Sequence, residues 1–102
     1  MARLVVMYRD PKNRDVFEKY YFETHIPIAK RIPGLRKYEV SQGPIMTPAG
    51  PSEFHLIATL HFDDLPAIQR AFASAEGQAA AADVQRFATA GADMYFFASR
   101  EV

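Results

Sequence analysis

The sequence predicts a small α+β domain whose elements follow the order β-α-β-β-α-β. Four short segments have the apolar content or the alternation of apolar and polar residues that is typical of strands, at residues 4–8, 35–42, 54–62 and 94–98. Segments with the helical spacing of apolar residues separate the first run from the second and the third from the fourth. At 102 residues the chain has the length of one domain, and we expect residues 1–102 to form a single unit.

The first strand and the first helix are expected near the amino terminus. Leu4–Tyr8 is rich in β-forming residues and stops before a turn signal at Asp10-Pro11. Because both of its faces carry apolar side chains, this strand is predicted to be central in the sheet. Asn13 or Asp15 can cap the helix that follows. One face of this helix is formed by Phe17, Tyr20, Tyr21, Thr24 and Ile28.

Pro27 interrupts this helical pattern. Its ring nitrogen cannot donate a hydrogen bond to the carbonyl of Glu23, and its ring disfavours helical geometry at the residue before it. We therefore expect the helix to kink or break near His25, and the segment to end at Pro33-Gly34.

The middle of the chain predicts two strands separated by a loop. Leu35–Gln42 alternates imperfectly and is predicted to be the second strand. Gly43–Ser52 holds three prolines and two glycines and is predicted to be a mobile loop. Phe54–Phe62 is the clearest strand, because its even-numbered residues are all apolar and its odd-numbered residues are mixed. One face of this strand is expected in the core, and the other against a pocket, a partner or solvent.

The last third of the chain predicts two helical segments and a strand. Asp63 or Asp64 can cap the first segment, and Ser74 can start the second, which runs through Phe87. The final strand is expected at Met94–Ala98. This order of elements is typical of the ferredoxin-like fold, with a four-stranded antiparallel sheet.

Large apolar side chains on both faces of two strands predict self-association. They are contributed by Val5 and Val6 in the first strand and by Tyr95 and Phe96 in the last. The helices of this fold cover one face of the sheet, so the other face would expose an apolar patch too large for a stable monomer. We expect two copies to pair through these sheet faces as a homodimer, giving a dimeric α+β barrel.

Composition excludes several other classes of protein. The 12 basic residues balance the 12 acidic residues without forming a basic block, so nucleic acid is not an expected partner. The apolar runs are far shorter than the ~20 residues that span a bilayer, and no signal-peptide pattern is present. We therefore expect a cytoplasmic protein without a membrane partner. The chain has no cysteine, which excludes thiolate metal sites and a cysteine nucleophile, and no metal site is expected from the spacing of the histidines.

His25 is the strongest candidate for chemistry. It follows Tyr21 by one helical turn, near the apolar stripe, and Pro27 distorts the backbone beside it. A neutral imidazole next to an apolar pocket can act as a general base or acid, because its ordinary pKa is close to neutral. The alternative is that His25 makes a structural hydrogen bond near a helix end.

Other polar side chains could complete a ligand pocket. Tyr8, Tyr21 and Tyr38 can donate hydrogen bonds to a ligand oxygen, although each can equally fill the core. His61 lies near the end of its strand and is a secondary ligand-binding candidate, ranked above His55. These two histidines are expected on one face of the strand but about 20 Å apart, so they cannot hold one metal ion together. Structural or interface roles are the alternative for both.

A series of motifs over nearly the whole chain is similar to a known family. The first half reads Phe17-x-x-Tyr20-Tyr21-x-x-x-His25-x-Pro27, followed by Pro33-Gly34-x-x-x-Tyr38. In the second half a strand ends at Phe62, a helix contains Ala71-Phe72, and Ser74-x-Glu76-Gly77 leads to Asp83 and Phe87. This pattern resembles that of EthD-like domains.

The resemblance implies a dimeric α+β barrel without a cofactor. EthD-like and neighbouring families include cofactor-free isomerases, polyketide cyclases, aromatic-ring monooxygenases and dehydratases, so a shared fold leaves the reaction open. In the methylmuconolactone isomerase branch, a histidine after the first helix and a tyrosine on the second strand take part in proton transfer. The matching positions here are His25 and Tyr38. That branch also uses a cysteine, which this chain lacks.

Three functional hypotheses follow from these observations. The first is a cofactor-independent enzyme acting on a small oxygenated cyclic or aromatic compound, with His25 shuttling a proton and Tyr38 and Tyr8 orienting an oxygen. Its pocket would lie between sheet and helices, closed by the Gly43–Ser52 loop. The second is a non-catalytic module that binds a small apolar ligand, and the third is an accessory dimer with structural histidines. They differ in whether His25 faces a cavity and has a partner that orients its ring.

Overall fold

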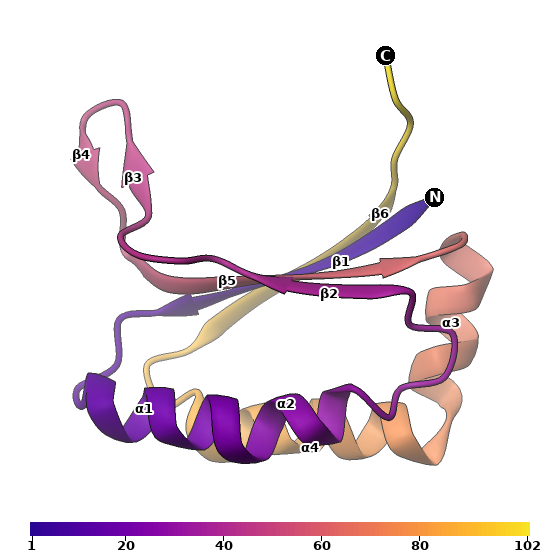
Figure 1. Cartoon of the computed structure of the whole chain (residues 1–102), viewed down its shortest axis with the longest axis horizontal. Coiled ribbons are helices and arrows are strands. Elements are labelled where there is room, and N and C mark those ends of the chain that lie inside the picture. Colours follow the sequence, from indigo (N-terminus) through magenta and orange to yellow (C-terminus); the bar gives the residue numbers. More distant parts are fainter.

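The computed structural model describes residues 1–102 and has the predicted α+β architecture. Its main sheet has four antiparallel strands in the order β2-β5-β1-β6. These strands are β1 (Ala2–Arg9), β2 (Lys37–Val40), β5 (Phe54–Phe62) and β6 (Ala92–Ala98). The helices lie on one side of this sheet (Figure 1). Strand order and chain order together are those of the ferredoxin-like fold.

Two helical segments run beneath the sheet, and a third helix stands at its end (Figure 1). The helical elements are α1 (Arg14–Tyr20), the π-helical turn η1 (Tyr21–His25), α2 (Ile26–Ala29), α3 (Leu65–Ala73) and α4 (Ala75–Phe87). The predicted caps Asn13, Asp64 and Ser74 each accept a hydrogen bond from a backbone N–H in the first turn of α1, α3 and α4. None of these helices has the length and apolar character needed to cross a bilayer.

The corner between α3 and α4 requires a glycine. A Cβ atom on Gly77 would lie 2.0 Å from the carbonyl oxygen of Ala71, closer than any two such atoms can approach. The missing side chain therefore lets α4 turn back beneath the sheet directly after α3. This turn carries the buried residues of α4 toward η1 and β1.

The core lies between the sheet and the helices. The even-numbered residues of β1, from Ala2 to Tyr8, are all buried, and so are Phe17, Tyr21 and Phe87 from the helices. The ring of Tyr8 meets each of these three aromatic rings at centroid distances of 5.5 or 5.6 Å. An aromatic cluster thus fixes α1, η1 and α4 against the central strand.

The other face of the sheet has no helix over it (Figure 1). The odd-numbered residues of β1 are only half-buried there. On the edge strand β6, Tyr95 and Phe97 are 59% and 43% exposed. The expected uncovered apolar face is therefore present.

A β-bulge changes which face of the sheet the first side chains of β5 point to. The register with β1 shifts between Tyr8 and Arg9. The prediction that Phe54 shares the core face with the other even-numbered residues is therefore wrong, because its ring lies 5.6 Å from the Arg9 guanidinium on the open face. His55 instead packs on Phe17 of α1, with ring centroids 5.3 Å apart.

The segment Gly43–Ser52 was expected to be a loop and instead contains a short hairpin. Its strands are β3 (Met46–Thr47) and β4 (Gly50–Pro51). The hydroxyl of Thr47 closes the turn by donating to the carbonyl of Gly50 at 2.9 Å. Gly50 has a positive φ of 127°, which a glycine adopts without strain. The hairpin projects from the side of the sheet that faces away from the helices (Figure 1).

Candidate functional site

His25 lies at the end of the π-helical turn η1, which joins α1 to α2. The N–H of Ile26 donates to the carbonyl of Tyr21, five residues back, which accommodates an extra residue within the helix. Pro27 then occupies the first turn of α2, where its missing N–H costs least. Of the expected kink or break, the break is absent, because the chain remains helical to Ala29, and the irregularity takes the form of the π-helical turn.

A buried carboxylate orients the ring of His25. The Nδ1 atom of His25 donates to Oδ2 of Asp83 at 2.9 Å, and the two residues are 4% and 1% exposed. Because a carboxylate can only accept, the proton of the neutral ring resides on Nδ1, and Nε2 carries a free lone pair. The hydroxyl of Tyr20 donates to the other oxygen, Oδ1, of Asp83 at 2.6 Å. Both carboxylate oxygens of Asp83 are thus engaged.

Burial keeps the His25 ring neutral near pH 7. Desolvation lowers the pKa of His25 from its ordinary value of 6.5, and the hydrogen bond and charge of Asp83 only partly oppose this effect. No side-chain nitrogen or oxygen in the protein is both sealed off and unpaired. Since Nε2 of His25 has no protein partner, this atom must retain some exposed surface.

His25 lines a small apolar cavity between the sheet and the helices. The cavity holds about 20 Å³, which is room for about one water molecule. Of its 14 lining residues, 13 are hydrophobic. They include Tyr8 and Tyr38, so the structure brings three predicted site residues to one space. Phe72 and Met94 also line it, and Met94 is 43% exposed.

Tyr21 supports this cavity through a tyrosine pair. Its hydroxyl lies 2.7 Å from the hydroxyl of Tyr38, and its ring centroid lies 5.4 Å from that of His25. Burial raises the pKa of Tyr8, of Tyr21 and of Tyr38 above the ordinary value. These phenols therefore stay protonated at neutral pH. They can donate hydrogen bonds to an oxygen but cannot act as bases.

The sheet separates His61 from His25. On the open face, Nε2 of His61 lies 2.7 Å from a carboxylate oxygen of Glu39, and the Arg3 guanidinium contacts the same ring. The predicted ligand-binding residue His61 is thus not brought to the cavity of His25. The expectation that His55 and His61 share one face is wrong, because the bulge turns His55 toward α1. No three His, Cys, Asp or Glu side chains gather closely enough to hold a metal ion.

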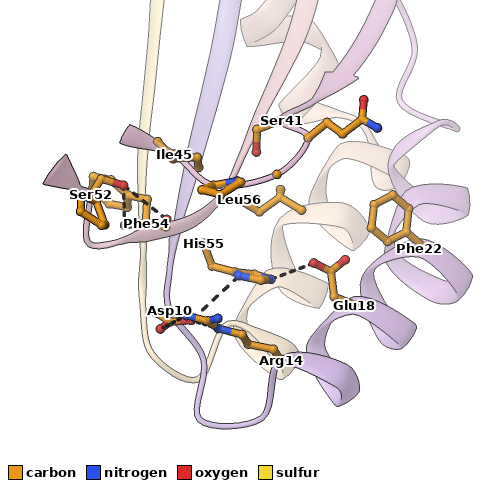
Figure 2. A pocket seen from close by; sticks show the side chains of 14 residues that line it. Asp10, Arg14, Glu18, Phe22, Ser41, Ile45, Ser52, Phe54, His55 and Leu56 are labelled. Carbon is orange, nitrogen blue, oxygen red and sulfur yellow. Dashed lines mark hydrogen bonds and ion pairs between the residues drawn. The ribbon is translucent and has the colours of Figure 1, made fainter. Parts of the chain in front are cut away.

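A larger cleft lies between α1, the start of β5 and the base of the β3–β4 hairpin (Figure 2). Its volume is about 450 Å³. His55 stands in it with Nε2 2.8 Å from a carboxylate oxygen of Glu18. The 43–52 segment borders this cleft and not the cavity of His25, so the expectation that it closes the His25 pocket is wrong.

Asp83 and Tyr20 are absent from the predicted site residues. Asp83 follows Ala80 by three residues and precedes Phe87 by four, so it falls on the buried face of α4. A lone carboxylate on an apolar helical face is a signal that could have found it, since a buried charge needs partners. Tyr20 gave no such signal, because its hydroxyl acquires a partner only through the packing of α4 on η1.

Comparison with known proteins gives one consistent family. The EthD domain profile matches residues 9–91. An uncharacterized 11.0 kDa protein from the thcB-thcC intergenic region of Rhodococcus erythropolis is 34% identical over 96 residues, covering 94% of this chain and 92% of that protein.

Solved structures extend this similarity to the fold. An EthD family protein of Bacillus halodurans C-125 is 31% identical with a TM-score of 0.90, over 98% of this chain and 99% of that chain. SnoaB of Streptomyces nogalater, a cofactor-independent oxygenase, is 16% identical with a TM-score of 0.68, over 99% of this chain and 94% of that chain. The similarity to SnoaB concerns the fold alone.

Proposed function

Because the chain belongs to the EthD family, we propose that residues 1–102 form a cofactor-independent enzyme that transfers a proton on a small oxygenated cyclic or aromatic compound. The observation that carries this proposal is the buried pair of His25 and Asp83. It leaves Nε2 of a neutral imidazole as an unpaired acceptor beside a cavity. A general base needs these properties, and a purely structural histidine does not.

The proposed step is a proton transfer through His25. Nε2 takes a proton from a substrate carbon or hydroxyl that is acidified by a neighbouring carbonyl group. The ring becomes an imidazolium whose charge is stabilised by Asp83 at 2.9 Å. The hydroxyl of Tyr8 or Tyr38 donates a hydrogen bond to the substrate oxygen on which negative charge develops. In an isomerisation the imidazolium returns the proton to a different substrate atom, so that no net proton is gained or lost.

Substrate binding requires the cavity to open. A volume of about 20 Å³ admits no ring compound. Phe72 and Met94 line the cavity and are only partly buried, so they can move without disturbing the fully buried core. We infer that substrate enters by displacing these two side chains, while Asp83 keeps the imidazole in place.

The proposed enzyme is a homodimer that pairs through the open sheet faces. The apolar surface of this face consists of the half-buried side chains of Val5, Met7 and Ile57 and the exposed rings of Tyr95 and Phe97. Their burial against a second copy is favourable by about 25 cal/mol per Å² of apolar surface. Sedimentation of the purified protein tests this assembly, and a monomer at micromolar concentration would contradict it.

The proposed proton transfer is tested by replacing His25. Small lactones and phenols are screened for turnover by the unaltered protein, and the best substrate is then given to His25→Gln and to His55→Gln. Loss of a general base predicts a decrease in kcat of about a hundredfold or more for His25→Gln, whereas His55→Gln retains the rate. An unchanged kcat in a folded His25→Gln protein would show that His25 is not the proton shuttle.

The second candidate function is non-catalytic binding of a small apolar ligand. The observation that favours it is the apolar lining of the His25 cavity, where 13 of 14 residues are hydrophobic. It predicts saturable binding with no turnover in the same screen. Turnover that is lost in a folded His25→Gln protein would contradict this second function.

A further inference from the structure

We propose that the cleft between α1 and the base of the β3–β4 hairpin is a second ligand site, which binds small aromatic amines. Its volume of about 450 Å³ lies within the roughly 300–1,000 Å³ typical of small-molecule sites. The cleft shares no lining residue with the cavity of His25. A ligand can therefore occupy it without touching the residues proposed for proton transfer, and the inference does not depend on that function.

One part of the cleft wall is apolar. Phe22 of η1, Ile45 before β3 and Leu56 of β5 come together here from three distant parts of the sequence (Figure 2). The ring of Phe22 is 47% exposed, whereas the other aromatic residues of α1 and η1 pack against the core. An exposed aromatic ring at a cleft can stack on the flat body of an aromatic ligand. The size of the cleft and this ring together favour an aromatic compound.

Another part of the cleft wall is charged. Asp10 and Arg14 form a two-pronged ion pair, with both hydrogen bonds at 2.7 Å, and so neutralise each other. Oε1 of Glu18 accepts from Nε2 of His55 at 2.8 Å. The second carboxylate oxygen of Glu18 has no protein partner, and Glu18 is 42% exposed at its side chain. Nδ1 of the same His55 ring lies 3.9 Å from Oδ1 of Asp10. Asp10 and Glu18 thus bring two carboxylates to the cleft, against the single guanidinium of Arg14.

The positions of Glu18 and Phe22 specify the ligand class. These residues are four apart in consecutive helical turns, so their side chains lie on the same side of the helix and both line the cleft. The ammonium group of a ligand can donate a hydrogen bond to the free oxygen of Glu18, while the aromatic ring of the same ligand stacks on Phe22. A carboxylate ligand would meet the negative charge of Glu18 instead. The cleft therefore favours an aromatic amine over an aromatic acid of the same size.

The experiment is an NMR titration of the ¹⁵N-labelled protein with three probes of matched shape. Benzylamine, benzyl alcohol and benzoate carry a positive, a neutral and a negative group on the same ring. We expect benzylamine to shift the backbone amides of residues 14–22, 41–45 and 52–56 saturably and to bind most tightly. Benzoate should bind at least about tenfold more weakly, the factor that corresponds to ~1.4 kcal/mol.

Two variants test the residues that carry the inference. Glu18→Gln should weaken benzylamine about tenfold and leave benzyl alcohol unchanged, since it removes a charge-assisted hydrogen bond. Phe22→Ala should weaken both probes, and it does not disturb the His55 contact. The proposal is overturned if benzylamine gives no saturable shifts, if benzoate binds equally well, or if both variants bind benzylamine like the unaltered protein. His25→Gln should leave the affinity unchanged, which separates this site from the proposed reaction.

Discussion

Two of the histidine–carboxylate pairs in the protein have nearly the same length but very different surroundings. His25 lies 2.9 Å from Asp83, with side chains that are 5% and 2% exposed. His55 lies 2.8 Å from Glu18, with side chains that are 15% and 42% exposed. The first pair borders a cavity of about 20 Å³, and the second stands in a cleft of about 450 Å³.

The buried pair is arranged for proton transfer, whereas the pair in the cleft has space for a ligand. In the buried pair, Asp83 has both oxygens occupied and the imidazole is held in one tautomer, so the pair is preorganised for proton transfer. In the cleft, Glu18 retains a free oxygen that water or a ligand can bind. The distances between histidine and carboxylate do not distinguish the two pairs. Their burial and the number of their other hydrogen-bond partners do, and these favour proton transfer in one pair and ligand binding in the other.

The largest expected difference between the pairs is in stability. Asp83→Ala should lower the free energy of unfolding by about 3 kcal/mol, because it leaves the Nδ1–H of His25 unpaired in the interior and also removes the partner of the half-buried Tyr20. Glu18→Ala removes the same kind of hydrogen bond at an exposed site, where water replaces it, and should cost much less. Urea denaturation of both variants measures the difference. Equal losses would show that burial does not distinguish the two pairs.

A smaller expected difference concerns pH. Because burial lowers the pKa of folded His25, the unfolded chain binds the extra proton first as pH falls through about 6.5. Stability should therefore decrease below this pH and level off only once folded His25 is itself protonated. The paired carboxylates Asp10, Glu39 and Asp63, whose pKa values are lowered, act in a more acidic range.

Two variants isolate this pH effect. His25→Gln should remove the component of the stability profile that begins near pH 6.5, and His55→Gln should retain it. Thermal unfolding between pH 5 and pH 8 provides the measurement. A profile in His25→Gln that parallels that of the unaltered protein would contradict a lowered pKa at this residue.

The order of elements could be predicted from local patterns. The apolar alternation of Phe54–Phe62 gave the bounds of β5, and the caps Asn13, Asp64 and Ser74 begin the helices where such residues are expected. These features depend on neighbours within a few residues. They were therefore accessible without knowledge of the tertiary structure.

The details of the site depended on contacts between distant segments. The bulge opposite Tyr8 and Arg9 turns His55 toward α1, and no pattern within β5 indicates it. Pro27 signalled a disturbed helix, but its resolution as a π-helical turn required the packing of η1 on the core. The buried position of Asp83 on α4 was accessible from its helical spacing, but its partner His25 was not, because it lies 58 positions away in the sequence.

The most direct test of the central claim is the ¹⁵N NMR spectrum of the histidine side chains across a pH titration. If His25 is a neutral base held by Asp83, its ring is protonated at Nδ1 and unprotonated at Nε2 near pH 7, and its pKa lies below 6.5. Asp83→Asn, if folded, should change the tautomer populations of His25 but not those of His55. A ring protonated at Nε2, or a pKa at or above the ordinary value, would contradict the assignment of His25 as the proton acceptor.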